Sequence, residues 1–407
     1  MLSFLQKFGI FCFLDNHQYN FNKSYECIAA AGMLQSVNAD NLTAIDTFKS
    51  IHEDWIFGHL SYDVKNQVEE LQSANPDLIQ FPDLFFFIPE IVFVFTETEL
   101  KIGIINDKQK ADKILASILS LPITEQNEKT KPQELQARFT KKEYVTVVEQ
   151  LRQHILKGDC YEINFCQEFY LDNAVIDPLQ VYNRLSSVSP NPFSAFYKVN
   201  DKYLICASPE RFMKKSGDTI ISQPMKGTVK RFINDIEDKK AIKQLSSDEK
   251  ERSENIMIVD LVRNDLAKIC EEGSVRVKDF LSIHSFPNVH QMISTIEGTL
   301  KNNILLSEIF AATFPMGSMT GAPKKRVMEL IEKYERTRRG LFSGTLGYIS
   351  PDGDFDFNVV IRSILYNENN KYVSIQAGSA ITFKSIAETE YEECLIKMEG
   401  MKRALAG

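Results

Sequence analysis

Apolar residues recur at helical spacing in one long stretch of the chain. Over residues 142–157 they stand three or four positions apart, at Tyr144, Val148, Leu151 and Ile155. This spacing puts them on one face of a helix, and Gly158 directly afterwards is a common helix stop. The pattern therefore predicts an amphipathic helix over 142–157.

Short apolar runs bounded by turn residues predict strands in the rest of the chain. The clearest runs cover residues 84–95, 203–207, 219–222, 346–350, 359–365 and 372–376. The first is long enough for two strands around a turn, and Pro351-Asp352-Gly353 is typical of a hairpin. Because strands joined by short turns pair antiparallel, and long helices stand between them, the predicted fold class is α+β with largely antiparallel sheets.

The length of 407 residues allows two or three domains, or one large domain with subdivisions. The segment 124–138 is polar and contains a proline, so we predict an exposed linker there. It divides the chain into an N-terminal subdomain, residues 1–123, and a C-terminal catalytic domain, residues 139–407. We expect the two to form one intertwined fold.

Bulk composition narrows the class of protein. Hydrophobic content of 43% and charged content of 25% are typical of soluble globular proteins. The net charge of −8, with no compensating basic stripe, argues against a nucleic-acid partner. Seven irregularly spaced cysteines without a Cys-x-x-Cys motif favour reduced thiols in a cytoplasmic protein. Neither a secretory signal nor an apolar run long enough to span a membrane is evident.

Two Glu-x-x-Glu pairs lie far apart in the chain: Glu251 with Glu254, and Glu390 with Glu393. Residues three apart share a helix face, and both faces continue into apolar positions. Carboxylates aimed along a partly apolar face need a cation or protons to be tolerated. Two such helices facing each other would suit Mg²⁺, which takes a few carboxylates plus substrate oxygens.

The same glutamates have a simpler interpretation. Ser246 to Glu249 and Ser385 to Glu388 have the spacing of capping boxes, which predicts a helix start before each pair. Acidic residues are favoured near helix N-termini by the helix dipole alone. The glutamate spacing by itself leaves both interpretations open.

Three charged residues stand out among the predicted strands and turns. Lys226 precedes Gly-Thr sixteen residues after Glu210 and is either a solvated loop lysine or, if desolvated, a nucleophile. Arg362 is a charge in the middle of the apolar run 359–365. A buried charge needs a partner, which would be either a bound carboxylate or a structural acid.

Two small-residue segments could bind anions through backbone amides. Residues 315–324 run into a predicted helix over 325–336, where amides at the N-terminus could hold a carboxylate. Residues 377–380, after a strand, could form a second amide nest. The alternatives are a tight turn and close strand packing. A small dianion bound through Mg²⁺ would account for the carboxylates, the cations and both nests at once.

These segments together resemble the chorismate-utilising enzymes, a family that includes anthranilate synthase component I, aminodeoxychorismate synthase component I, and the isochorismate and salicylate synthases. Seven segments match in order: 158–164, 208–212, 226–228, 254–266, 317–324, 361–363 and 390–393. The N-terminal run Gly58 to Asn66 looks more like the aminodeoxychorismate branch. The resemblance implies a β-sandwich-like core flanked by helices.

The resemblance also implies ligands for the predicted site. Mg²⁺ would be held mainly by Glu254 and Glu393, with Glu251 and Glu390 beside them, and would bind the ring carboxylate of chorismate. The enolpyruvyl carboxylate would meet Arg362, Gly378 and Lys397. Further substrate-binding positions carried over from the family are Thr228, Gln291, Ser318 and Phe342.

Lys226 indicates the branch, because anthranilate synthases typically carry alanine at that position. In the aminodeoxychorismate branch this lysine is thought to attack C2 of chorismate as the C4 hydroxyl leaves, with a residue matching Glu210 as general acid and base. Ammonia from a glutamine amidotransferase subunit then enters at C4 and gives 4-amino-4-deoxychorismate, a precursor of p-aminobenzoate and folate. Attack needs a neutral amine, so we expect Lys226 to be desolvated or near a second cation. The alternatives are anthranilate synthase component I and a non-catalytic chorismate-binding homologue.

Four positions depart from the family pattern. Glu162 stands where both aminating branches usually have Gln, and where the isochorismate and salicylate synthases have a lysine base, so a hydroxylating reaction is disfavoured. Gln291 replaces a histidine beside the leaving group. Ala380 replaces the last glycine of a Gly-Ala-Gly nest, and Phe342 replaces Tyr or Trp. Of these, Glu162, Gln291 and Ala380 are the best support for a non-catalytic homologue.

Overall fold

The computed structural model describes the chain apart from residues 20–24, 105–107, 122–133, 287–288 and 407. Most of the predicted linker over 124–138 therefore lies outside the described residues. Among the helices that the structure describes, none is long and apolar enough to cross a membrane. All seven cysteines are free thiols, as predicted.

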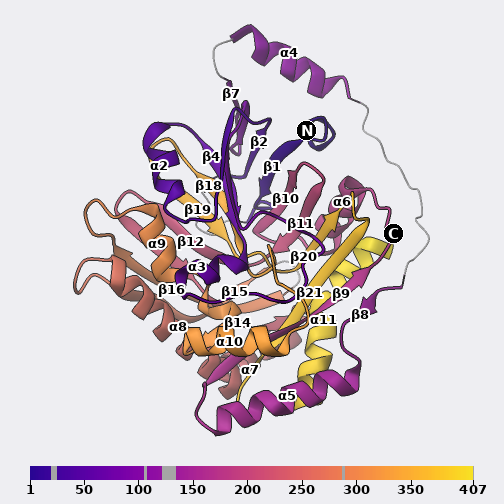
Figure 1. Ribbon diagram of the computed structural model, residues 1–407, viewed down its shortest axis with the longest axis vertical. Coiled ribbons are helices and arrows are strands. Elements are labelled where there is room, and N and C mark those ends of the chain that lie inside the picture. The colour runs from indigo at the N-terminus through magenta and orange to yellow at the C-terminus, as the bar shows by residue number, and fades with distance from the viewer. Residues whose placement is uncertain (20–24, 105–107, 122–133, 287–288, 407) are drawn as a thin grey trace.

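Two antiparallel sheets make up the centre of the molecule (Figure 1). The 11-stranded sheet contains, in spatial order, β17 (Gly321–Ala322), β9 (Glu162–Leu171), β21 (Tyr372–Ile381), β20 (Ser363–Asn367), β11 (Lys202–Ser208), β10 (Phe193–Val199), β1 (Ile10–Asp15), β2 (Cys27–Ala31), β6 (Ile91–Phe95) and β7 (Leu100–Ile104), with β8 (Gln136–Ala137) paired to β9.

The 10-stranded sheet contains, in spatial order, β14 (Met225–Lys230), β16 (Val289–Thr299), β13 (Thr219–Gln223), β12 (Arg211–Ser216), β19 (Phe355–Asn358), β18 (Thr345–Ile349), β4 (Ile56–Leu60), β5 (Leu84–Ile88) and β3 (Gln35–Asn38), with β15 (Arg276–Ser285) paired to β16. The largest buried apolar cluster takes side chains from both sheets, including Cys12 and Ala30 on one and Phe57 and Phe86 on the other. The predicted α+β class with an antiparallel sandwich core is confirmed.

Helices cover the sandwich on both sides. The helical segments are α1 (Leu2–Leu5), α2 (Ala44–Ile51), η1 (Tyr62–Val64), α3 (Lys65–Val68), α4 (Lys108–Leu119), α5 (Lys141–Leu156), α6 (Pro178–Val188), α7 (Asp235–Ser247), α8 (Glu249–Ile269), α9 (Leu306–Thr313), η2 (Gly317–Met319), α10 (Lys324–Tyr334) and α11 (Ala387–Ala406). A second apolar cluster packs α5, α6, α10 and α11 on the 11-stranded sheet. On the other sheet, α8 packs against β14, β15 and β16 (Figure 1).

The first 104 residues are shared between the two sheets. They supply β1, β2, β6 and β7 to the 11-stranded sheet, and β3, β4 and β5 to the other. The run 84–95 forms two strands around a turn, as predicted, but β5 and β6 join different sheets. N-terminal and C-terminal strands are therefore neighbours in both layers.

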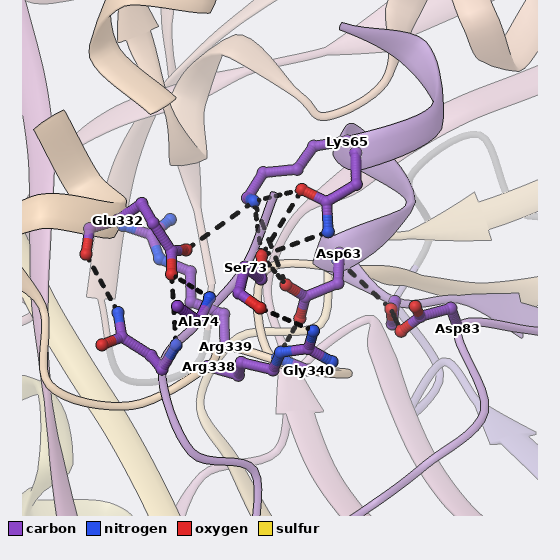
Figure 2. Close-up of polar contacts among 12 residues, drawn as sticks. Asp63, Lys65, Ser73, Ala74, Asp83, Glu332, Arg338, Arg339 and Gly340 are labelled. Carbon is purple, nitrogen blue, oxygen red and sulfur yellow. Dashed lines mark hydrogen bonds and ion pairs between the residues drawn. The ribbon is translucent and has the colours of Figure 1, made fainter. Parts of the chain in front are cut away.

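A buried ionic network fastens the N-terminal segment around η1 to the C-terminal half (Figure 2). The Asp63 carboxylate accepts from the Gly340 amide at 3.1 Å, and the Ser73 carbonyl accepts from the Arg338 guanidinium at 3.0 Å. Next in the chain, the buried Arg339 forms an ion pair with Glu335 at 2.6 Å. Arg339 also donates to backbone carbonyls of residues 164 and 319, so the network supports two segments that line the cavity described below.

Most local predictions hold, but two predictions about strands fail. Helix 142–157 is confirmed as α5, and Gly158 follows it with φ +82°. The run 359–365 is a strand only from Ser363, because Arg362 has φ +51° in a bend before β20. Residues 377–380 continue β21 in register with β9 and do not follow the strand.

The predicted capping boxes are wrong at both helices. Ser246 lies inside α7, and Asp248 caps α8 by accepting from the Glu251 amide at 3.0 Å. The Ser385 hydroxyl donates back to the Ala380 carbonyl. Aspartate and serine are both favoured N-cap residues, and Asp248 is the one that directly precedes α8. Ser246 is two residues further away, in the last turn of α7.

Candidate active site

A cavity of about 650 Å³ lies where β9 and β21 of one sheet meet β14 and β16 of the other, with α8 and α11 beside them. It is lined by all but one of the residues that the sequence predicts for the site: Glu210, Lys226, Thr228, Glu251, Glu254, Gln291, Ser318, Phe342, Arg362, Gly378, Glu393 and Lys397. Glu390, the exception, is buried beside the cavity and contacts Lys250, which does line it.

Lys226 stands in β14, on the edge of its sheet, and its amine is largely buried. Gly227 follows with φ +79°, and a side chain there would press on Leu245 and Glu251, so the glycine lets β14 approach α8. The Lys226 ammonium donates to Glu162 at 2.8 Å and lies 3.5 Å from Glu254. It is thus held between a strand of the opposite sheet and α8.

The protonation state of Lys226 differs from the sequence-based expectation of a neutral amine. Burial alone would lower the pKa of Lys226, but the carboxylates of Glu162 and Glu254 outweigh it and raise the pKa well above its usual value. The desolvation that we expected is present. A second cation beside Lys226, which would favour the neutral amine, is not what determines its charge. The two adjacent carboxylates favour the protonated form of Lys226.

Acids and lysines alternate in a series beside the cavity, and its three middle members, Lys226, Glu254 and Lys250, line the cavity. The order is Glu162, Lys226, Glu254, Lys250 and Glu390, with successive N–O distances of 2.8, 3.5, 3.8 and 3.0 Å. The series runs from the 11-stranded sheet through β14 and α8 to α11. Each acid is partly neutralised by a lysine, which explains how so many carboxylates are buried together.

The paired glutamates lie on α8 and α11, with the two pairs near each other as predicted. Burial raises the pKa of Glu254 to about 7, against the opposing effect of the Lys226 cation. Burial and repulsion from Glu393 raise the pKa of Glu251. Burial would raise the pKa of Glu393 too, but the Lys397 cation at 2.7 Å outweighs it and lowers the pKa.

The carboxylates have the donor chemistry of a hard-cation site. Among the described residues, no three acidic, histidine or cysteine side chains converge as ready-made ligands for one ion. The Lys250 ammonium contacts both Glu254 and Glu390 instead. However, Glu254 Oε1 and Glu390 Oε2 are buried and accept no hydrogen bond. Buried carboxylate oxygens without a hydrogen bond fit a cation such as Mg²⁺.

Glu210 follows β11 and also lines the cavity. It is almost fully buried, and its carboxylate accepts from the Ser318 hydroxyl at 2.7 Å. Burial raises the pKa of Glu210 to about 7, although the Ser318 hydrogen bond and the Lys226 cation oppose the shift. A carboxyl group with a pKa near neutrality can both give and take a proton.

Two cations lie at the end of the cavity near β21 and α11. Within the described residues, the Arg362 guanidinium makes no direct hydrogen bond or ion pair, and burial lowers its pKa. Lys397 donates to the Gly378 carbonyl at 2.9 Å and pairs with Glu393. Of the two interpretations of Arg362, the free guanidinium favours a bound anion over a structural ion pair.

The remaining predicted residues fall on the cavity wall with different environments. Gly378 allows β21 to approach β9, because an added Cβ would lie 2.0 Å from the Phe165 carbonyl oxygen. Phe342 is buried, and Thr228 is exposed at the rim. Gln291 faces the cavity with an unpaired Oε1.

His290 does not replace Gln291 in the cavity. It points to the other face of β16, where its ring contacts Asp238 at 2.9 Å and Ser285 at 2.8 Å. Two site residues were not predicted as such from the sequence. Lys250 was missed, although it precedes Glu254 by four positions and so shares its helix face, and Glu162 was noted only as a departure.

The chain belongs to the family of chorismate binding enzymes, whose model matches residues 13–403. Aminodeoxychorismate synthase component 1 of Bacillus subtilis is 33% identical over 360 residues, covering 86% of this chain and 76% of the relative. Anthranilate synthase component 1 of Aquifex aeolicus is 30% identical over 369 residues, which cover 86% of this chain and 74% of the relative.

Solved structures confirm the fold. Anthranilate synthase component I from Streptococcus pneumoniae superposes with a TM-score of 0.80 at 27% identity, over 97% of this chain and 92% of the other. Both aminating branches are thus represented among the similar proteins. The family and the fold are therefore secure, whereas the choice of branch depends on individual residues.

Proposed function

We propose that this chain is the chorismate-aminating component of an aminodeoxychorismate synthase, which places ammonia on C4 of chorismate. The observation that carries the proposal is the position of Lys226. Lys226 lines the same cavity as Glu210. By the family resemblance, a lysine at this position marks the C4-aminating branch, where the C2-aminating branch typically has alanine. The similarity to the Bacillus subtilis aminodeoxychorismate synthase supports the same choice.

Chorismate would lie with its two carboxylates at two cationic positions. Arg362 and Lys397 would receive the enolpyruvyl carboxylate, since the Arg362 guanidinium feels the charge of Glu393 but makes no direct hydrogen bond or ion pair within the described residues. Glu254 and Glu393, with Glu251 and Glu390 beside them, would hold Mg²⁺. A bound Mg²⁺ would neutralise the ring carboxylate and fix its orientation.

Lys226 and Glu210 would carry the covalent chemistry. Because Lys226 rests as a cation, it first gives a proton to one of the two adjacent carboxylates, Glu162 or Glu254. The Lys226 nitrogen then forms a bond to C2, both ring double bonds shift, and the C4–O bond breaks while Glu210 gives its proton to the leaving hydroxyl, which departs as water. Ammonia bonds to C4, both double bonds return, and the C2–N bond breaks to release the neutral Lys226 amine. Glu210 takes the proton that ammonia loses, and Lys226 regains its own from the carboxylate.

Ammonia would come from a separate glutamine amidotransferase subunit. The word component in the names of the similar proteins is consistent with such a partner. We expect free ammonium salts to support turnover by this chain alone, and glutamine to support it only when the partner is added.

The second candidate is amination at C2 with loss of pyruvate, which gives anthranilate. The similarity to anthranilate synthases in sequence and structure favours it. The experiment incubates the protein with chorismate, Mg²⁺ and an ammonium salt, then measures chorismate loss and pyruvate release together. We expect chorismate loss without pyruvate. Equal amounts of pyruvate and anthranilate would reject the proposal.

Lys250 should compete with Mg²⁺, because its ammonium contacts two of the proposed metal carboxylates. Replacing it by Met is expected to tighten Mg²⁺ binding about tenfold, the effect of roughly 1.4 kcal/mol of charge repulsion. Isothermal titration of the chorismate-free protein measures this. Lys268→Met, on the same helix and outside the cavity, should leave the affinity unchanged. Weaker Mg²⁺ binding by the Lys250 variant would contradict the account.

The pH dependence should report Glu210. Because its pKa is raised to about 7, the protonated form that assists the leaving hydroxyl is lost as pH rises through that value. At constant free ammonia and saturating Mg²⁺, kcat/KM for chorismate should therefore fall above about pH 7. Glu210→Gln should be ~100-fold slower and lose this limb. If kcat/KM of the variant still falls above about pH 7, the fall is caused by the titration of another group and not of Glu210.

A further inference from the structure

Glu162 is the only carboxylate among the described residues that reaches Lys226 from the 11-stranded sheet. It opens β9, its side chain is fully buried, and its Oε1 accepts from the Lys226 amine at 2.8 Å. Its other oxygen, Oε2, is buried and accepts no hydrogen bond. Among the described residues, the contact with Lys226 is thus the only ion pair of the buried Glu162 carboxylate, and it offsets part of the cost of burying that charge.

We propose that Glu162 is a positioning residue, which holds the Lys226 amine closer to β9 than to the metal-side carboxylate of Glu254. The proposal deepens the proposed function and rests on it for the role of Lys226. Glu162 itself need not touch chorismate. It acts through the lysine that does.

Stability alone does not explain this pair. Replacing a buried ion pair by uncharged groups of similar size is often neutral or stabilising, because burying both charges costs as much as their attraction returns. The unpaired Oε2 adds to that cost. A carboxylate at this place in β9 is therefore expected to contribute something other than folding free energy.

We infer from the distances around Lys226 that Glu162 contributes to the position of the amine. The Lys226 amine has two competing carboxylates, Glu162 at 2.8 Å on the side of β9 and Glu254 at 3.5 Å on α8. A lysine carries its charge on a flexible four-carbon stem, so the closer carboxylate sets the resting position. Without the Glu162 charge, the Lys226 amine is drawn toward Glu254 and Glu251. The amine then moves away from its position for attack on chorismate. It also neutralises carboxylates that are needed to bind Mg²⁺.

Two consequences separate this role from a structural one. Removing the charge should lower kcat with little change in KM for chorismate, because the nucleophile is misplaced while the substrate contacts at Arg362 and Lys397 remain. It should also weaken Mg²⁺ binding, since Lys226 then competes for Glu254. The second effect is measured without turnover.

The test compares Glu162→Gln with Glu168→Gln. Glu168 lies on the same strand and face, is also buried, and pairs with Arg138 at 2.8 Å outside the cavity. For Glu162→Gln we expect kcat per folded protein to fall about 30-fold, KM to change by less than about threefold, and the Mg²⁺ Kd from isothermal titration to rise about tenfold. Because one partner of a buried pair is removed, the melting temperature is measured beside them and the protein is assayed well below it. The Glu168 variant should retain wild-type kcat and Mg²⁺ affinity.

Unchanged kcat and Mg²⁺ affinity in Glu162→Gln would overturn the proposal, as would a loss of activity matched by the loss of folded protein. A rise in KM alone would also overturn it, by making Glu162 a substrate contact. If the wild-type protein gives anthranilate, the proposed function fails, yet the Mg²⁺ titration still decides whether Glu162 positions Lys226.

Discussion

Replacing Lys226 with alanine is expected to reduce formation of 4-amino-4-deoxychorismate to below about one thousandth of the wild-type rate, a loss of ~4 kcal/mol of transition-state stabilisation. The reason is that the variant has no nucleophile for C2. The Arg362 and Lys397 contacts are untouched, so chorismate binding should persist. Rapid-quench product analysis measures the rate, and equilibrium binding measures the affinity.

Lys202→Ala provides the control for that experiment. Lys202 begins β11, pairs with Asp201 at 2.7 Å and lies outside the cavity, so its loss should leave turnover unchanged. If Lys226→Ala forms the same product at a rate within about tenfold of wild type, Lys226 is an electrostatic contact and the covalent route is wrong.

Replacing Glu254 with Gln is expected to weaken Mg²⁺ binding by more than about 100-fold and to abolish turnover at ordinary Mg²⁺ concentrations. Glu254 is buried, has an oxygen that accepts no hydrogen bond, and stands at the centre of the alternating acids and lysines. The amide keeps the shape of the side chain but removes its charge. Mg²⁺ titration and turnover after chelation and readdition of Mg²⁺ check the two effects.

Glu249→Gln is the matched control, because Glu249 lies on the same helix with an almost fully exposed side chain. It should leave both measurements unchanged. Turnover by the wild-type protein that persists through chelation would show that the acids of α8 and α11 serve a purpose other than metal binding.

Local sequence patterns predicted the parts of this molecule that depend on neighbours in the chain. The spacing of Tyr144, Val148 and Leu151 is a property of one helix face, and α5 appears where that spacing placed it. The same holds for Glu251 and Glu254, whose shared face on α8 turns toward the cavity.

Contacts between distant segments could not be predicted in this way. The apolar run 359–365 does not reveal that Arg362 bends out of the strand, because the bend depends on packing against other parts of the sandwich. The sequence around the turn between β5 and β6 does not indicate that these two strands pair in different sheets. The positions of Lys250 and Glu162 among the predicted acids also follow from tertiary structure, and with them the charge of Lys226.

The position of the new C–N bond tests the central claim most directly. The wild-type protein is incubated with chorismate, Mg²⁺ and ¹⁵N-labelled ammonium, and the carbon bonded to ¹⁵N in the product is identified by NMR. The account predicts nitrogen on C4 of a ring that still carries its enolpyruvyl group. Nitrogen on C2 of an aromatic ring that has lost pyruvate would contradict it.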